Sequence, residues 1–383
     1  MDEETRLIRA GHVDKLPART VSPPIQRGST VLLPNAKALY DGTLGYGRAG
    51  LSAQFALMDA LCELEEAKSV QLYPSGLAAM TAGIMAVLKA GDHLLVVDSV
   101  YRPVRYFCDR VLRRFGVVVD YYDPNLDAEA LMALTTPATR LIVLESPGSL
   151  SFEMQDVAAV AAAARARGVL TLVDNTWGAG RLFKPLAHGA DISVQALTKY
   201  VCGHSDVFMG SAAANDPQLV AALKASIQDH GWSVSGEDAY QALRGLRTLA
   251  TRLDRHGESG LTVARWLADQ PEVLRVLHPA LPGAPGHEIW KRDYSGACGL
   301  FGFVLRPGSP ERVEAFLDAL ELFGLGFSWG GFESLAVSSD HQLKMRVLSP
   351  DYGGPLMRLH VGLENTADLI ADLRQALDVY AAD

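Results

Sequence analysis

Three chemically active side chains follow two apolar segments of the chain. Segment 191–199 is apolar and β-branched and closes with Thr198 and Lys199, while segment 168–177 places Asp174 after its own apolar run. Both runs have the pattern of buried strands in an α/β sheet. Ligands of open α/β sheets bind beyond the carboxyl ends of the strands, so we expect these side chains to meet at one edge. A lysine that forms a Schiff base and a carboxylate that pairs with a pyridinium nitrogen are what pyridoxal phosphate (PLP) chemistry needs. The alternatives are an exposed lysine and a helix-capping aspartate.

Two glycine-containing segments have the residue types that bind phosphate. Ser75 and Gly76 lead into a predicted helix, and the first turn of a helix offers free N–H groups and a positive dipole to an anion. Ser75 could equally serve only as an N-cap. In the second segment, Tyr46 and Arg48 lie among glycines, and an arginine there suits bidentate contact with a phosphate. A solvated loop arginine is the alternative.

Segment 45–50 also matches the G-x-G-x-x-G pattern of dinucleotide-binding proteins. That motif requires a buried strand directly before it. The preceding segment 39–44 is short, polar and contains a glycine, and the acidic residues about 20 positions later fall within a predicted helix. We therefore favour a PLP enzyme over an NAD-dependent oxidoreductase, which stays as an alternative.

Composition narrows the class of partner and the compartment. The chain has 383 residues, of which 49% are hydrophobic and 21% charged, as in ordinary globular proteins of roughly two to three domains. A net charge of −9 disfavours nucleic acids and anionic membranes as partners. Apolar runs stop well before the length of a membrane span, and the first residues lack the pattern of a secretory signal. The cysteines show no CxxC spacing, so we expect no metal site and a cytoplasmic location: Cys62, Cys108, Cys202 and Cys298.

Hydrophobic periodicity divides the chain into three regions. Residues 1–55 are polar and rich in proline and glycine up to a helix predicted over 51–67, and they form an N-terminal arm. Residues 56–245 alternate short apolar runs with helical patterns, which predicts βαβ units and a largely parallel sheet. Residues 246–383 predict a smaller α+β domain. Its expected elements are helices over 248–270, 310–322 and 366–381 and a strand over 300–305.

Nine motifs along the chain together resemble the Cys/Met-metabolism family of PLP-dependent enzymes. The resemblance covers about 5–375, and the motifs are Tyr46-Gly-Arg48, Tyr73-Pro-Ser75-Gly76, Asp98-Ser-Val-Tyr101, Glu145-Ser-Pro147, Asp174-Asn-Thr-Trp177, Thr198-Lys199-Tyr200, Gly203-His-Ser-Asp206, Gly245-Leu-Arg-Thr248 and Arg358-Leu-His-Val-Gly362. Within the family, three features resemble the bacterial cystathionine β-lyases: the Ser-Trp-Gly-Gly run at 328–331, Ser149 in place of the usual Asn, and Ala196 in place of the usual Ser.

The resemblance implies a fold and an activity. The implied fold is the aspartate-aminotransferase-like fold (fold type I), a mainly parallel seven-stranded sheet between helices with an N-terminal arm and a smaller C-terminal domain. The implied activity is β-elimination from L-cystathionine, a carbon–sulfur lyase reaction that belongs to methionine biosynthesis. The alternatives are a γ-lyase or γ-synthase, a broader cysteine-S-conjugate β-lyase and a non-catalytic PLP-binding regulator. The implied assembly is a homodimer, paired into a tetramer.

The resemblance also implies a role for each matching residue. Lys199 would form the Schiff base and act as the catalytic base, Asp174 would hold the pyridine nitrogen protonated, and Tyr101 would stack on the ring and help deprotonate the substrate amine. The phosphate would be held by Ser75, Gly76, Leu77 and Thr198, with Tyr46 and Arg48 contributed by the neighbouring subunit.

For the substrate, the resemblance implies that Arg358 clamps the α-carboxylate with Ser328 beside it. Trp329 and Tyr240 would shape the pocket, although core packing is an equal alternative for both. One residue departs from the pattern of the β-lyases, since Arg102 stands where they often have Glu. This departure leaves the distal end of the substrate pocket undefined.

Overall fold

The computed structural model describes residues 2–11, 20–348 and 350–382. Seven strands form the larger sheet, in the order β1 (Ser69–Tyr73), β7 (Gly210–Ala214), β6 (Ile192–Gln195), β5 (Leu170–Asp174), β4 (Thr139–Glu145), β2 (His93–Val97) and β3 (Val118–Tyr122). Strand β7 runs antiparallel to both of its neighbours, and the other pairs are parallel. The predicted seven-stranded, mainly parallel sheet is therefore confirmed.

The helices of this region are α2 (Ser52–Glu65), α3 (Gly76–Met85), α4 (Arg102–Phe107), α5 (Ala128–Ala133), α6 (Val157–Ala166), α7 (Pro217–Asp229) and α8 (Gly236–Leu246). Helices α3 and α7 contact the β7 end of the sheet, and α6 packs on β5. Helices α8 and α5 pack instead on α2 and α6. Several begin at a residue whose side chain caps the first turn. Ser75 does so for α3 by accepting the N–H of Ala78 at 3.1 Å.

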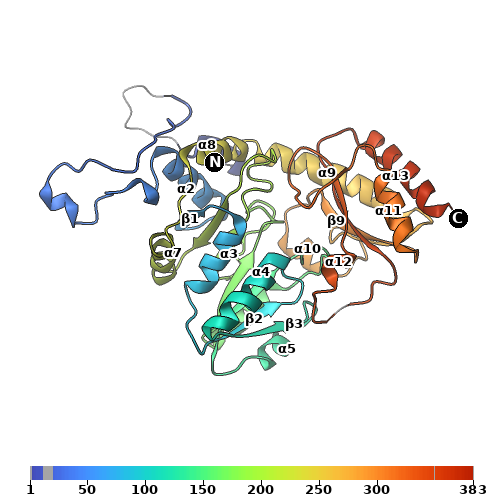
Figure 1. Cartoon of the computed structure of the whole chain (residues 1–383), viewed down its shortest axis with the longest axis horizontal. Helices are drawn as coiled ribbons and strands as arrows, with labels where there is room; N and C mark the ends of the chain where they lie inside the picture. Colours follow the sequence, from blue (N-terminus) through green and yellow to red (C-terminus); the bar gives the residue numbers. More distant parts are fainter. Residues whose placement is uncertain (1, 12–19, 349, 383) are drawn as a thin grey trace.

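A second sheet with its own apolar core follows the long helix α9 (Leu249–Ala268). Its strands are ordered β10 (Gly324–Leu325), β11 (Leu335–Ser338), β12 (Leu356–His360), β9 (Leu300–Leu305) and β8 (Val273–Leu277). The helices of this region are α10 (His287–Asp293), α11 (Pro310–Asp318), α12 (Asp340–Leu343) and α13 (Thr366–Ala381). Figure 1 shows these elements, in yellow to red, at the opposite end of the molecule from the N-terminal arm. The predicted helix over 366–381 is confirmed, while α11 ends four residues before the predicted boundary at 322.

A segment of the N-terminal arm before α2 extends away from the rest of the molecule, whereas the short helix α1 (Glu3–Arg9) packs on α2 (Figure 1). The arm also contains an isolated bridge between Thr30 and Tyr46 and a 3-10 turn over Gly47–Ala49. Part of the predicted arm, 12–19, lies outside the described residues. Segment 39–44, directly before Gly45, contains no strand, so the structural context that a dinucleotide motif needs is missing at this position.

Candidate active site

Lys199 lies in a turn rather than at the end of a strand. Strand β6 ends at Gln195, so the prediction that the strand continues to Lys199 is wrong by four residues. The chain turns at Ala196, which packs so closely on the start of α3 that a Cβ added to Gly76 would lie 2.4 Å from the Ala196 Cβ. The buried Leu197 then anchors the turn in the core. Asp174, in contrast, is the last residue of β5 as predicted.

The amine of Lys199 is surrounded by side chains from both sheets. Its Nζ atom donates to the Ser328 hydroxyl at 2.9 Å and lies 5.4 Å from the centre of the Trp329 ring. Burial, together with the positive charge of Arg358, lowers the pKa of Lys199 to about 8, against the opposing effect of Asp174. A substantial fraction of this amine is therefore neutral near physiological pH, which is the form that acts as a nucleophile or base.

Two carboxyl groups end neighbouring strands beside the lysine. Glu145 of β4 pairs in register with Asp174 of β5. Burial raises the pKa of both groups, and the charge of Asp174 raises the pKa of Glu145 further. Hydrogen bonds from the Thr176 side chain and backbone N–H, together with the nearby Lys199, oppose the effect of burial on the pKa of Asp174. Two buried carboxyl groups this close disfavour a negative charge on both, and these contacts favour the charge on Asp174.

Tyr101 stands over this pair, with 45% of its surface exposed in the cavity. Its backbone N–H donates to Glu145 Oε2 at 2.6 Å, which fixes the residue at the start of α4. Partial burial and the nearby carboxylates raise the pKa of the Tyr101 phenol above its usual value. The phenol is therefore protonated at neutral pH, and its predicted help in deprotonating a substrate amine stays a prediction. No role was predicted for Glu145 from the sequence, although this residue ends an apolar strand just as Asp174 does.

Arg358 on β12 is buried, and part of its guanidinium has no hydrogen-bond partner among the described residues. One terminal nitrogen donates to the backbone carbonyls of Phe327 at 2.7 Å and Ser328 at 3.2 Å, which orients the guanidinium. Its Nε atom is buried and has no hydrogen-bond partner. Burial lowers the pKa of Arg358 to about 10, so the group still carries its charge at neutral pH. A buried cation with an unused donor has the chemistry to bind a carboxylate.

The predicted phosphate site lies at the first turn of α3. The N–H groups of Gly76 and Leu77 occupy positions that have no acceptor within the helix, and Ser75 caps the same turn. The hydroxyl of Thr198 is already bonded to Met209, donating to its carbonyl at 3.1 Å and accepting from its N–H at 2.9 Å. Contact between Thr198 and a phosphate would require the hydroxyl to give up that carbonyl.

Three predicted residues are not brought to the site within one chain. Tyr46 and Arg48 lie on the arm, where the guanidinium stacks on the Tyr46 ring at 5.3 Å. Tyr240 lies on α8 and packs against the core of the larger sheet. None of the three lines the cavity that contains Lys199. The expectation that Tyr240 shapes this pocket is therefore not met within a single chain.

Five of the predicted residues line one cavity or its narrow extension, while Ser328 lies beside the cavity and reaches the Lys199 amine. The cavity has a volume of about 330 Å³ and contains Tyr101, Lys199, Trp329 and Arg358. The extension reaches Glu145 and Asp174. A lysine with a lowered pKa, a buried carboxylate and the free N–H groups of a helix start are the groups that PLP requires, so the residues present fit this cofactor. No helix among the described residues is long and apolar enough to cross a membrane.

Comparisons with known proteins agree with this geometry. The model of the family "Cys/Met metabolism PLP-dependent enzyme" matches residues 4–378. A putative cystathionine beta-lyase of Rhizobium johnstonii is 46% identical, over 94% of this chain and 92% of the relative. The cystathionine beta-lyase MetC of Escherichia coli is 42% identical, over 97% of this chain and 96% of the relative. The crystal structure of metB from Corynebacterium glutamicum superimposes with a TM-score of 0.91 at 31% identity, covering 99% of this chain and 98% of that one. The chain therefore belongs to the Cys/Met metabolism family of PLP-dependent enzymes.

Proposed function

We propose that this enzyme is a carbon–sulfur lyase that cleaves L-cystathionine by β-elimination into homocysteine, pyruvate and ammonia. The observation that carries the proposal is the amine of Lys199, which has a pKa lowered to about 8 and lies in one cavity with the unpaired donor of Arg358. The relatives named cystathionine beta-lyase, at 42% and 46% identity, support the same activity.

Each side chain has a distinct part in the reaction. When bound, PLP supplies an electron sink that stabilises negative charge at the substrate Cα. Arg358 holds the α-carboxylate, and the anionic Asp174 keeps the pyridine nitrogen protonated. Lys199 removes the Cα proton and, as an ammonium, returns a proton to the leaving sulfur. Tyr101 and Trp329 cover the reacting atoms, and Ser328 holds the lysine amine between these steps.

The keto acid that the purified enzyme releases tests this proposal. Incubation with L-cystathionine should release pyruvate, while release of 2-oxobutyrate would show γ-elimination and contradict the assignment. Borohydride should trap PLP on the peptide that contains Lys199. Lys199→Ala should abolish both the trapping and the turnover while leaving the circular dichroism spectrum unchanged. Trapping on a different lysine would remove Lys199 from its assigned role.

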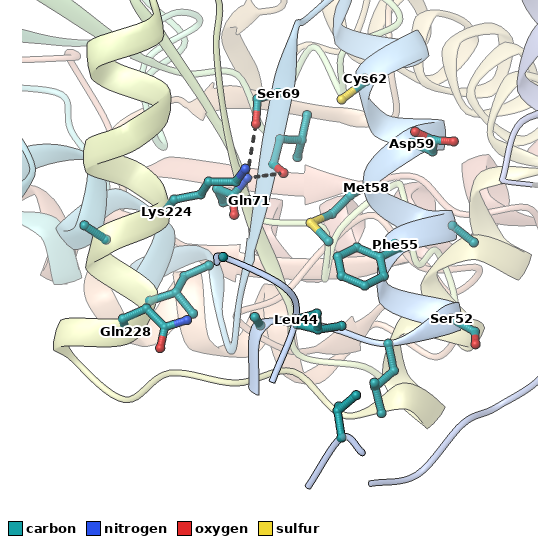
Figure 2. A pocket seen from close by; sticks show the side chains of 18 of the residues that line it. Leu44, Ser52, Phe55, Met58, Asp59, Cys62, Ser69, Gln71, Lys224 and Gln228 are labelled. Atoms are coloured by element: carbon teal, nitrogen blue, oxygen red, sulfur yellow. Dashed lines mark hydrogen bonds between the residues drawn. The ribbon is translucent and has the colours of Figure 1, made fainter. Parts of the chain in front are cut away.

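We propose further that the catalytic unit is a homodimer in which the arm completes the partner's phosphate site. A cavity of about 1080 Å³ lies between the arm, α2 and α7, and Figure 2 shows Leu44, Phe55 and Met58 on its wall. Large apolar side chains of the arm are also exposed, including Leu32 at 91% and Tyr40 at 93%. Such apolar surfaces suit a partner subunit. Pairing of the dimers into a tetramer and a cytoplasmic location complete the proposal.

A mixture of two inactive variants tests the shared site. Lys199→Ala and Arg48→Ala chains, unfolded and refolded together, should regain activity, because one of the two sites in each hybrid dimer has both residues intact. By this count, about half of the activity per hybrid should return. Confirmed subunit exchange without recovered activity would place Arg48 in its own chain's site. We also propose that the chain consists of the arm 1–55, a PLP-binding domain 56–245 built around the larger sheet and a C-terminal domain 246–383 built around the smaller sheet.

A further inference from the structure

One set of residues that line the active-site cavity takes no part in any of the assigned roles. We call it the α4 side, and it is formed by residues from α4 and from the segment after β11: Arg102, Tyr106, Gln342, Leu343 and Met345. A substrate whose reacting atoms lie at Lys199 would place the group beyond its sulfur in the remaining space of this cavity. The charges on the α4 side therefore decide which leaving groups fit.

Among the described residues that line the cavity, Asp98 is the one acidic residue, and its charge is already used. Its Oδ1 atom accepts from Arg105 at 2.6 Å and from the Val347 N–H at 2.9 Å. Its Oδ2 atom accepts from Arg346 at 3.2 Å and from the Leu348 N–H at 3.1 Å. The carboxylate is fully buried. No acidic group of this wall is left to receive a substrate ammonium.

Arg102, unlike Asp98, forms no ion pair among the described residues. Its Nε and one terminal nitrogen donate to the Tyr106 hydroxyl at 2.9 and 2.6 Å, and its guanidinium lies 5.1 Å from the Tyr106 ring centre. That hydroxyl in turn donates to the Met345 sulfur at 3.0 Å, which orients Tyr106. Among the described residues, no carboxylate pairs with Arg102. The guanidinium is therefore held in place with its positive charge uncompensated.

We propose that Arg102 selects substrates by the charge beyond the sulfur, favouring a carboxylate and disfavouring an ammonium. An anion there would complete the hydrogen bonding of a pre-oriented guanidinium, while a lone ammonium would meet a like charge with no free carboxylate on this wall to balance it. A leaving group that carries both charges, as in L-cystathionine, would direct its carboxylate to Arg102. This inference rests on the proposed β-elimination and assigns the specificity of that same site.

Two cysteine thioethers of opposite charge test the inference. S-(2-carboxyethyl)-L-cysteine and S-(2-aminoethyl)-L-cysteine share the reacting half and differ in the distal group, and S-ethyl-L-cysteine serves as the neutral reference. The holoenzyme should cleave the carboxyethyl compound with a kcat/KM about 10- to 100-fold above that for the aminoethyl compound, as expected for a charge-assisted contact. Arg102→Met should abolish this preference, Arg102→Lys should keep its direction and Arg102→Glu should invert it.

Arg110 provides a matched control on the same chain segment. Its guanidinium lies 4.0 Å from the centre of the same Tyr106 ring, but it is exposed and does not line the cavity. Arg110→Met should therefore keep the preference. Equal kcat/KM values for the two charged substrates in the unmodified enzyme would overturn the inference, as would a preference that survives in Arg102→Met and Arg102→Glu. Failure to release pyruvate from any of these substrates or from L-cystathionine would instead refute the proposed function.

Discussion

The reactivity of Lys199 towards PLP should depend on pH in a way that differs from an ordinary lysine. Its pKa is lowered to about 8 from 10.5 because the amine is buried beside the positive charge of Arg358. At pH 7, about one amine in ten is then neutral, compared with a few in ten thousand for an ordinary lysine. Since the neutral amine is the nucleophile, the rate of covalent attachment should be roughly 300-fold higher than for an unperturbed lysine of equal nucleophilicity.

The assay follows PLP binding to protein from which the cofactor has been removed. Absorbance would give the rate of covalent attachment across a pH range that includes both pKa values, and borohydride trapping would confirm that the product is on Lys199. The rate should rise with pH and level off above a midpoint near 8. Arg358→Gln removes the nearby cation and should move the midpoint upward, whereas Arg358→Lys keeps the positive charge and should leave it near the original value.

Two results would refute this reasoning. A midpoint close to 10.5 would show that the lysine is hydrated and unperturbed, despite its contact with Ser328. An Arg358→Gln midpoint that stays in place or falls would show that the guanidinium does not act on the amine. In the second case burial alone would account for the lowered pKa.

Three further perturbations test the other contacts of the site. Arg358→Lys should raise KM for L-cystathionine by roughly 30- to 900-fold with PLP still bound, since losing a bidentate contact costs about 2–4 kcal/mol; an unchanged KM would remove Arg358 from the site. Glu145→Gln should preserve activity because the raised pKa of Glu145 favours its neutral form and the amide keeps an acceptor for the Tyr101 N–H, while Glu145→Ala leaves that N–H unpaired and should lower the free energy of unfolding by about 1–3 kcal/mol; equal damage by both would show that the charge of Glu145 matters. Asp98→Asn should cost about 3–5 kcal/mol in urea unfolding, because buried Arg105 loses its carboxylate partner and buried Arg346 keeps only Glu153, against less than about 1 kcal/mol for Asp109→Asn in an exposed pair; similar losses would contradict the buried network.

Local sequence patterns predicted the larger sheet and the position of Asp174 at the end of a strand. The apolar run before Asp174 is a strand that ends at that residue, because a carboxylate is costly to bury within a sheet but not at its edge. The same pattern misplaced Lys199. Residues 196–198 continue the apolar run in sequence, but hydrogen bonding between strands stops at Gln195. Periodicity reports burial, and Leu197 is buried in the turn as fully as it would be in a strand.

The contacts between distant segments could not be predicted from periodicity. Ser328 lies in an irregular loop of the smaller sheet and reaches Lys199, 129 residues earlier in the chain. Asp98 binds Arg346 across a separation of 248 residues. Such pairings depend on how the two sheets pack, which no local window records. Ser328 was assigned to the site only through the resemblance to the family. Neither the local patterns nor the resemblance assigned a role to Asp98 or Glu145.

The loop that contains Ser328 links two tasks that enzymes often adjust separately. Its side chain accepts from Lys199, the proposed base, and the backbone carbonyl of the same residue accepts from Arg358, the proposed receptor for the substrate carboxylate. A displacement of this loop therefore moves both of these groups together. Substitutions around positions 326–330 will therefore change kcat and KM together. A substitution in this loop that is selected because it improves binding of a new substrate will also change the turnover rate. Substitutions that change the substrate but preserve turnover are therefore expected mainly outside the loop. Side chains there contact the substrate without contacting Lys199 or Arg358.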